Sequence, residues 1–354
     1  MVLAEDEKWM RRALRLAARG AGRTSPNPIV GAVVVKDGTA VAEGFHRRAG
    51  EPHGESEALR RAGAAARGAT LYLNLEPCAH HGRTPPCVDA AIASGIRRVV
   101  ASMRDPDPRV DGKGFRKLRA AGLEVETGVL EAEARRLNEG FISRIERGRP
   151  FVTLKLVTTL DGRVAVEGRR YLSGKAALKE VHRMRDRLDA VMIGVGTVLA
   201  DDPELTVREI RGRDPLRVVL DTEARTPPTA KVVRAGDPQH TLVFVARDAD
   251  QRRVKRLRDA GVPIATLPRS GEGLDIAAGL RWLAEHGVNT VLSEGGPRVA
   301  ASLLREGLAD RLLFLVAPIA GGKGPHALEG VAPVELRSFR VRRAGPDVMI
   351  EADL

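Results

Sequence analysis

Two stretches, His53-Gly54-Glu55 and Pro77-Cys78-Ala79-His80-His81-Gly82-Arg83-Thr84-Pro85-Pro86-Cys87, hold the chemistry around which the rest of the chain is arranged. The second stretch contains both cysteines of the 354-residue chain. Imidazole and thiolate are ligands that Zn²⁺ prefers, and a zinc ion held by three protein ligands keeps a fourth position for water. We therefore expect His53, Cys78 and Cys87 to bind a zinc ion.

Glu55 is expected to carry protons rather than to bind the metal. An H-x-E sequence followed by P-C and a second cysteine is typical of zinc deaminases, in which the glutamate is no ligand. Zinc lowers the pKa of its bound water toward about 7. A nearby carboxyl group can then move protons from water to the ring nitrogen and the departing amine.

Other interpretations of the two cysteines remain open. They could form a disulfide, although a chain without a secretion signal is expected in a reducing compartment. They could be inert core residues, although their Pro, Gly and Arg neighbours are not typical of a core. A structural zinc ion would need a fourth ligand, for which His46, His80 and His81 are available.

Length and composition predict two domains in a cytoplasmic protein. At 38.1 kDa the chain exceeds one typical domain. Aromatic residues make up 3% of the chain, so the cores should consist of Val, Leu, Ile and Ala. The sequence has no apolar run of about 18 residues and begins with an acidic segment, which argues against a membrane span or a signal peptide.

The net charge of +12 does not by itself indicate nucleic-acid binding, because basic and acidic residues alternate along the chain. In the densest basic run, 252–259, Val254 and Leu257 keep helical spacing, so this run is interpreted as a solvated helix face. Excess Arg also suits phosphorylated small molecules, which guanidinium groups bind through two hydrogen bonds. We expect neither a nucleic-acid nor a membrane partner.

Helix and strand patterns alternate through residues 1–147 and again through residues 150–354, with a break at Arg147-Gly148-Arg149-Pro150. In the first half we expect helices at 5–19, 55–67, 88–94, 115–121 and 131–146, a hairpin at 29–45, and strands at 69–75, 97–102 and 123–126. In the second half we expect strands at 151–157, 190–193, 216–220, 241–245, 262–267 and 290–292, and helices at 175–187, 276–286 and 299–305. The H-x-E stretch thus begins a helix and Cys78 follows a strand, as in sites at the edge of an α/β sheet.

The eight residues between the cysteines resemble the pyrimidine deaminases of riboflavin biosynthesis, as do the stretches 25–31, 50–53 and 104–108. This resemblance implies a cytidine-deaminase-like α/β sandwich for residues 1–147, with Asn27 contacting the substrate. Asn27 could also be a simple turn residue before the first strand.

The second half resembles the reductase part of the same bifunctional enzymes in the stretches 154–163, 197–203 and 294–297. The resemblance implies a dihydrofolate-reductase-like α/β domain over residues 150–354. It implies NADPH contacts by Thr158, Tyr171, Thr197, Asp201, Thr222, Gly296, Pro297 and Arg298. It implies substrate contacts by Arg185, Leu205, Arg208 and Glu294. Guanidinium groups can neutralise a phosphate and a carboxylate can bind ribose hydroxyls, whereas surface salt bridges are the ordinary alternative.

The segment 167–173 departs from the family, which usually has Ser-x-Trp-Ile-Thr there. Tyr171 takes the place of the Trp near the cofactor, and Arg169 takes the place of a substrate-contacting Ser. A guanidinium is not equivalent to a hydroxyl group, so no binding role is predicted for Arg169.

Together these features predict a two-step enzyme that deaminates a diaminopyrimidine ribosyl phosphate and then reduces its ribosyl group with NADPH. The resemblance also implies a homo-oligomer, a dimer or a tetramer. Two alternatives are an RNA-binding deaminase and a catalytically inactive zinc scaffold. The low aromatic content argues against the first and the intact Glu55 against the second.

Overall fold

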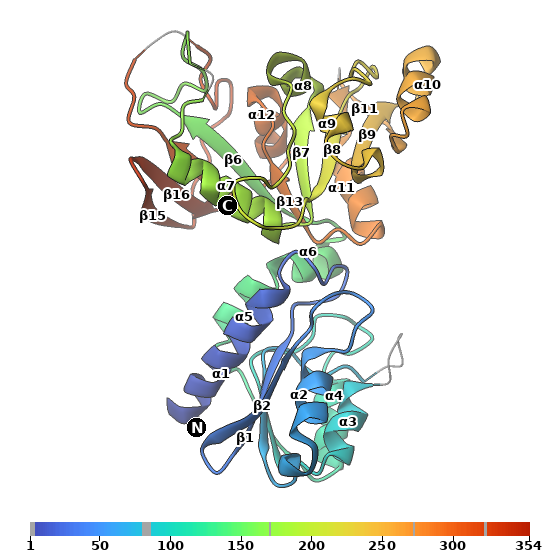
Figure 1. Cartoon of the computed structure of the whole chain (residues 1–354), viewed down its shortest axis with the longest axis vertical. Helices are drawn as coiled ribbons and strands as arrows, with labels where there is room; N and C mark the ends of the chain where they lie inside the picture. Colours follow the sequence, from blue (N-terminus) through green and yellow to red (C-terminus); the bar gives the residue numbers. More distant parts are fainter. Residues whose placement is uncertain (1–3, 80–85, 170, 272, 322–323) are drawn as a thin grey trace. The chain divides into compact units, whose positions relative to one another are not determined.

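The computed structural model describes residues 4–79, 86–169, 171–271, 273–321 and 324–354, which form two compact units (Figure 1). The first unit ends at Gly148 and the second begins at Arg149. Each unit contains one main β-sheet with helices on both faces, which confirms the predicted α/β class. In the described parts of the chain, no helix is long and apolar enough to cross a membrane.

A five-stranded sheet in the order β2-β1-β3-β4-β5 forms the centre of the first unit. Its strands are β1 (Gly31–Lys36), β2 (Thr39–Phe45), β3 (Thr70–Leu73), β4 (Arg98–Ala101) and β5 (Glu124–Thr127). Its helices are α1 (Ala4–Ala17), α2 (Gly54–Ala62), α3 (Cys87–Ala93), α4 (Lys113–Ala120), α5 (Glu131–Leu137) and α6 (Glu139–Arg147). The predicted hairpin is confirmed, because β1 and β2 pair antiparallel. Strand β1 also pairs antiparallel with β3, whereas β3, β4 and β5 are parallel.

The alternation of side chains along β1 decides which helix covers which face of this sheet. Val33 and Val35 pack with Trp9, Met10 and Ala13 of α1. Ala32 and Val34 point to the opposite face, where they pack with apolar residues of α2, α3 and α4. Because successive strand residues face opposite ways, these four small apolar residues of β1 contribute to two separate cores.

The predicted single helix over 131–146 is wrong, because it is interrupted at Asn138. This residue leaves helical geometry (φ −104°, ψ 16°) and ends α5 before α6 begins. Its side chain accepts a hydrogen bond from Ile29 N at 2.7 Å and donates one to Ile29 O at 3.0 Å. The buried Asn138 amide thus bonds to both the N–H and the C=O of Ile29. These bonds favour the break over a continuous helix.

A nine-stranded sheet is the centre of the second unit, in the order β10-β9-β8-β7-β13-β6-β14-β16-β15 within the described chain. Its strands are β6 (Phe151–Thr158), β7 (Ala190–Gly194), β8 (Leu216–Leu220), β9 (Thr241–Ala246), β10 (Ile264–Leu267), β13 (Thr290–Ser293), β14 (Arg311–Val316), β15 (Ser338–Ala344) and β16 (Asp347–Asp353). Strands β11 (Arg269–Ser270) and β12 (Gly273–Leu274) form a separate small hairpin. The helices are α7 (Lys175–Arg187), α8 (Val195–Asp201), α9 (Lys231–Arg234), α10 (Gln251–Asp259), α11 (Ile276–Glu285) and α12 (Pro297–Arg305).

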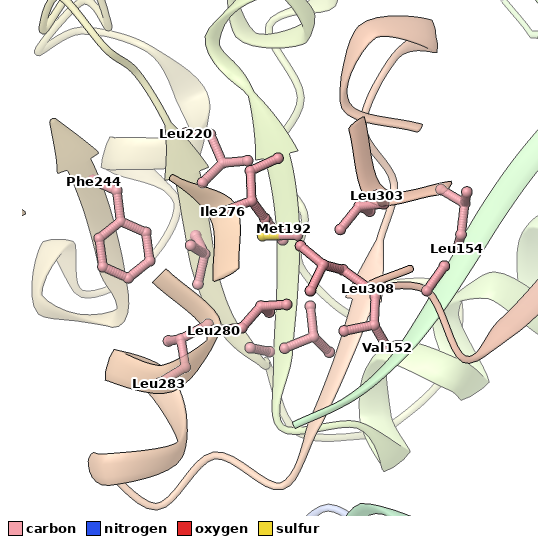
Figure 2. Packing of buried hydrophobic residues seen from close by; sticks show 14 of the residues in the cluster. Val152, Leu154, Met192, Leu220, Phe244, Ile276, Leu280, Leu283, Leu303 and Leu308 are labelled. Carbon is pink, nitrogen blue, oxygen red and sulfur yellow. The ribbon is translucent and has the colours of Figure 1, made fainter. Parts of the chain in front are cut away.

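The strands from β10 to β14 are parallel, and β16 and β15 complete the sheet antiparallel at one edge. Figure 2 shows one face of this sheet, where Leu280 and Leu283 of α11 and Leu303 of α12 meet side chains of the central strands. Residues of α8, α9 and α10 cover the other face. Strand β9 is buried along its whole length, as expected for a parallel strand between two helical layers.

Three strands at the end of the chain, β14, β15 and β16, were not predicted from the sequence. They comprise residues 311–316, 338–344 and 347–353, with β15 at the edge of the sheet. Residues 338–343 of β15 are exposed, so most of this strand lies outside the core.

Candidate active sites

The three predicted zinc ligands come from three segments that meet in the first unit. His53 is the N-cap residue of α2, Cys78 lies in the loop after β3, and Cys87 is the first residue of α3. One donor atom of each lies within 4.8 Å of the other two. Nδ1 of His53 is 3.4 Å from the sulfur of Cys87 and 3.9 Å from that of Cys78. A His/Cys/Cys donor set of this size fits zinc.

The electrostatics of this cluster favour a thiolate at neutral pH. The hydrogen bond from Cys87 lowers the pKa of Cys78 to about 4. Burial favours the neutral His53 ring, but its hydrogen bond with Cys78 and the charges of Glu55, Cys78 and Asp105 together outweigh burial and raise the pKa of His53 to about 9. Metals bind thiolates and neutral imidazoles, so metal binding here displaces protons.

Glu55 lies in the first turn of α2, two residues beyond the His53 cap. Its side chain is buried, with the residue 2% exposed, and its Oε2 atom has no hydrogen-bond partner among the described residues. Burial raises the pKa of Glu55 above its ordinary value. A buried carboxyl group with an unused oxygen beside a zinc-type donor set is suited to taking up and releasing a proton.

His46 does not belong to the cluster of donor atoms. Its Nδ1 lies 3.1 Å from Pro52 O, and its Nε2 lies 3.1 Å from Nδ2 of Asn27. Both ring nitrogens are therefore engaged, and His46 instead orients the Asn27 side chain. His80 and His81, the other candidates for a fourth ligand of a structural zinc, lie outside the described residues.

Asp105 is a candidate site residue to which sequence reasoning gave no role, although it lies in one of the family-like stretches. The Asp105 side chain is buried just beyond the carboxyl end of β4, and burial is the main cause that raises its pKa to about 7. Glu76 fixes this loop by accepting backbone hydrogen bonds from Asp105, Gly112 and Phe115. The charges of Asp105 and Cys78 act on one another, so this carboxyl group belongs to the surroundings of the predicted ligands.

A cavity of about 2260 Å³ lies in the second unit at the carboxyl ends of its parallel strands. Its walls include the segments that follow β7, β8 and β13, together with one face of α7. In open α/β sheets, ligands bind at this edge of the strands.

A buried ion-pair network forms one wall of this cavity. The carboxylate of Glu294 accepts hydrogen bonds from Arg185 Nε at 2.7 Å, Arg185 Nη2 at 3.0 Å and Lys155 Nζ at 2.9 Å. Burial alone would raise the pKa of Glu294, but the two cations outweigh it and hold the pKa well below its usual range. Lys155 received no role from the sequence, although a lysine within the apolar strand 151–157 was a visible signal.

The remaining predicted substrate residues, Leu205 and Arg208, also line the cavity. Leu205 is buried and has a positive φ of 57°, which is uncommon for a residue other than glycine. The side chain of Arg208 is 46% exposed, and its Nη1 lies 3.5 Å from Glu204 Oε2. The guanidinium is thus held only weakly by the protein.

Most of the predicted cofactor residues share the same cavity. Those that line it are Tyr171, Thr197, Asp201, Thr222, Gly296, Pro297 and Arg298. Thr158 is an exception, because it is buried on β6 and lines a smaller pocket of about 390 Å³ with Phe314 and His326. Arg169 lines the large cavity too, although no role was predicted for it.

The loop before α12 brings backbone close to the cavity. A side chain at Gly295 would meet Val299, because an added Cβ would lie 2.7 Å from the Val299 Cβ. Gly296 is the N-cap of α12 and Pro297 its first residue, so free backbone N–H groups of the first turn face the end of the helix. This arrangement favours an anionic group such as a phosphate.

Comparisons with known proteins match both units. Residues 3–103 match the cytidine and deoxycytidylate deaminase zinc-binding region, and residues 150–350 match the RibD C-terminal domain. The curated riboflavin biosynthesis protein RibD of Aquifex aeolicus is 42% identical over 358 residues, which cover 99% of both chains. RibD of Escherichia coli is 40% identical, with 98% of both chains covered.

Solved structures agree with these matches over the whole length. RibD of Acinetobacter baumannii superposes with a TM-score of 0.88 at 37% identity, covering 99% of this chain and 98% of the other. A Thermotoga maritima protein, described as a diaminohydroxyphosphoribosylaminopyrimidine deaminase/5-amino-6-(5-phosphoribosylamino)uracil reductase, superposes with a TM-score of 0.86 at 38% identity and the same coverage. The predicted combination of a deaminase-like and a reductase-like fold is therefore confirmed.

Proposed function

Because the chain belongs to the RibD family of bifunctional riboflavin-biosynthesis enzymes, we propose that its two units act in turn on one phosphorylated diaminopyrimidine. The first step hydrolyses a ring amine of 2,5-diamino-6-ribosylamino-4(3H)-pyrimidinone 5′-phosphate and releases ammonia. The second step reduces the ribosyl group of the product to ribityl with NADPH. The observation that carries the first step is the buried oxygen of Glu55, which has no hydrogen-bond partner among the described residues, beside the His/Cys/Cys donor set.

In the deaminase unit, residues 1–147, His53, Cys78 and Cys87 would hold the zinc ion. When bound, zinc makes hydroxide available at neutral pH by lowering the pKa of water. Glu55 accepts a proton from the attacking water and passes protons to the ring nitrogen and the leaving amine. The raised pKa of Glu55 suits this role, because a buried carboxyl group is readily protonated. Asn27, oriented by His46, contacts the pyrimidine.

In the reductase unit, residues 150–354, the cavity would hold both NADPH and the substrate. NADPH supplies the hydride that reduces C1 of the ribosyl group. Glu294 accepts hydrogen bonds from ribose hydroxyls, and Arg185 with Arg208 neutralises the phosphate. Leu205 packs against the substrate, and Lys155 keeps the Glu294 carboxylate charged and fixed.

The cofactor contacts are assigned by position. The residues proposed to bind NADPH are Thr158, Tyr171, Thr197, Asp201, Thr222, Gly296, Pro297 and Arg298. The free N–H groups at the start of α12 suit its diphosphate. Thr158 does not line the large cavity, but its neighbour on β6, Val157, does. Thr158 would therefore contact NADPH at the edge of the site.

We also propose a cytoplasmic homo-oligomer. Exposed apolar side chains support self-association: Phe339 and Val341 on the edge strand β15, and Val334 and Leu336 before it. An edge strand with unpaired backbone groups and apolar side chains is a ready surface for another chain. Molar mass measured by light scattering would show a monomer if this proposal were wrong.

One experiment tests both activities separately. The purified protein is incubated with the diaminopyrimidine phosphate, with and without NADPH, while ammonia release and NADPH oxidation are followed in parallel. We expect ammonia in both reactions and NADPH oxidation only after deamination has begun. NADPH oxidation without ammonia, or ammonia without any NADPH oxidation, would contradict the proposed two-step function. A parallel binding assay with tRNA at low salt separates this function from that of an RNA-binding deaminase.

A further inference from the structure

Helix α7 holds the loop that carries Arg208 by two side chains on consecutive turns. Nδ1 of His182 accepts a hydrogen bond from the backbone N–H of Arg208 at 3.1 Å. Arg185 Nη1 donates to the carbonyl of Thr206 at 3.0 Å. His182 and Arg185 are three residues apart, so they share one face of the helix, and both line the cavity.

The acceptor on His182 is present at neutral pH. The residue is 3% exposed, and burial, followed by the charges of Arg185 and Arg208, lowers its pKa. The ring is therefore neutral, and because Nδ1 accepts a hydrogen bond, its proton is on Nε2. A buried neutral histidine in this tautomer gives the Arg208 N–H a partner that water would otherwise have to supply.

The loop needs such an anchor because its own conformation is unfavourable. Asp202 and Leu205 both have positive φ values, 42° and 57°, which residues with a Cβ adopt at a cost in free energy. The guanidinium of Arg208 makes contacts of only 3.5 Å, with Glu204 and Thr206. Its position therefore depends on where the backbone of Arg208 is fixed.

We propose that His182 is a positioning residue of the reductase site, which fixes the backbone of Arg208 through Nδ1 and thereby aims the guanidinium at the substrate phosphate. This inference rests on the proposed phosphate-binding role of Arg208. No comparison assigns a role to His182, and its side chain acts on the substrate through the loop.

Two variants separate the hydrogen bond from the bulk of the ring. His182→Phe keeps a ring but removes the acceptor, and His182→Asn keeps an acceptor oxygen near the position of Nδ1. We expect His182→Phe to raise the KM for the deaminated substrate about tenfold, the size of effect given by a lost hydrogen-bond partner. The kcat and the Kd for NADPH should stay near the original values. His182→Asn should restore most of the KM, and His240→Phe, at an exposed histidine, should leave it unchanged.

Trypsin cleavage after Arg208, mapped by mass spectrometry, reports the anchoring of the loop without any substrate. His182→Phe should speed this cleavage while cleavage elsewhere in the reductase unit stays the same, and His182→Asn should not. The inference is overturned if His182→Phe changes neither KM nor cleavage, or if His182→Asn is as impaired as His182→Phe. Arg208→Ala serves as the parallel test: if it leaves KM unchanged, the phosphate assignment fails, whereas cleavage still decides whether His182 holds the loop.

Discussion

The carboxylate of Glu294 and the guanidinium of Arg185 form a two-point ion pair, with N–O distances of 2.7 and 3.0 Å. Their side chains are 7% and 10% exposed, and Lys155 adds a second cation to the same carboxylate. Two cations around one carboxylate leave one net positive charge in the cavity wall. The wall therefore favours an anionic ligand. Removal of the Glu294 carboxylate would leave two like charges buried together.

Glu294→Gln should destabilise the reductase unit. Breaking a buried pair by removing one partner costs about 3–5 kcal/mol, because the remaining charge is uncompensated. Here two cations, Arg185 and Lys155, would remain. Thermal unfolding of the variant should show a lowered transition for the second unit, whereas the exposed Glu306→Gln should have little effect. Equal unfolding temperatures of Glu294→Gln and Glu306→Gln would mean that the ion pairs of Glu294 add no stability.

The same carboxylate predicts a pH dependence. The cations hold the pKa of Glu294 below its usual value, which is about 4.5. When folding lowers the pKa of a carboxyl group, the group contributes its full stabilisation above the pKa that it has in the unfolded chain. This contribution is lost as the pH falls through the pKa of the folded protein. Between neutral pH and about 4.5 the contribution stays complete, and below 4.5 it declines. Unfolding midpoints measured on acidification should therefore fall more steeply for the wild type than for Glu294→Gln, and parallel curves would contradict this.

The sequence predicted helices and strands correctly where an apolar pattern began and ended at clear positions. Helix α7 begins and ends as expected, at Lys175 and Arg187, because its apolar face is regular and Gly174 precedes it. The buried strands β8 and β9 were located by their apolar runs. The three zinc ligands were predicted from the H-x-E stretch and the two cysteines, which a single sequence displays directly.

What could not be predicted depends on contacts between distant segments. The break at Asn138 follows from its bonds to Ile29, more than a hundred residues earlier. The ion pair of Lys155 with Glu294 also joins distant residues: the lysine stands out within its apolar strand, but nothing in the local pattern identifies Glu294 as its partner. The positive φ of Leu205 likewise reflects the packing of its loop, because leucine itself disfavours that conformation.

Cys87→Ser should remove or greatly weaken zinc binding. Elemental analysis of the wild type should give about one zinc per chain, held by His53, Cys78 and Cys87. A serine hydroxyl is not readily deprotonated and is a poor replacement for a thiolate. His46→Asn is the matched control and should keep its zinc, because both nitrogens of His46 already have partners. Full zinc in Cys87→Ser would exclude Cys87 from the site.

Arg208→Ala should weaken substrate binding in the reductase without affecting the cofactor. The variant loses a charge-assisted contact to the phosphate, worth about 1.5–3 kcal/mol. The KM for the deaminated substrate should rise by about 10- to 150-fold at about 1.36 kcal/mol per factor of ten. The affinity for NADPH should stay the same, and its selective loss would mean that the two subsites have been exchanged.

Glu55→Gln separates the two activities within one chain. The change keeps the size of the side chain but removes its ability to take up and release protons. Zinc should stay bound, because Glu55 is not among the donor atoms that cluster around His53. General acid–base catalysis contributes about 10²–10⁴-fold, so ammonia release should fall by at least that factor, or about 2.7–5.5 kcal/mol.

The reductase provides the internal control for this variant. Reduction of the pre-deaminated substrate should proceed at the original rate, because every residue proposed for that step lies beyond Pro150. The Glu55→Gln protein should therefore accumulate the diaminopyrimidine and oxidise NADPH only when it is given the deaminated compound. Glu57→Gln, two residues further along the same helix, should leave both activities unchanged, because Glu57 pairs with Arg60 and Arg61. Near-normal ammonia release by Glu55→Gln would remove Glu55 as the proton carrier, and with it the proposed mechanism of the first unit.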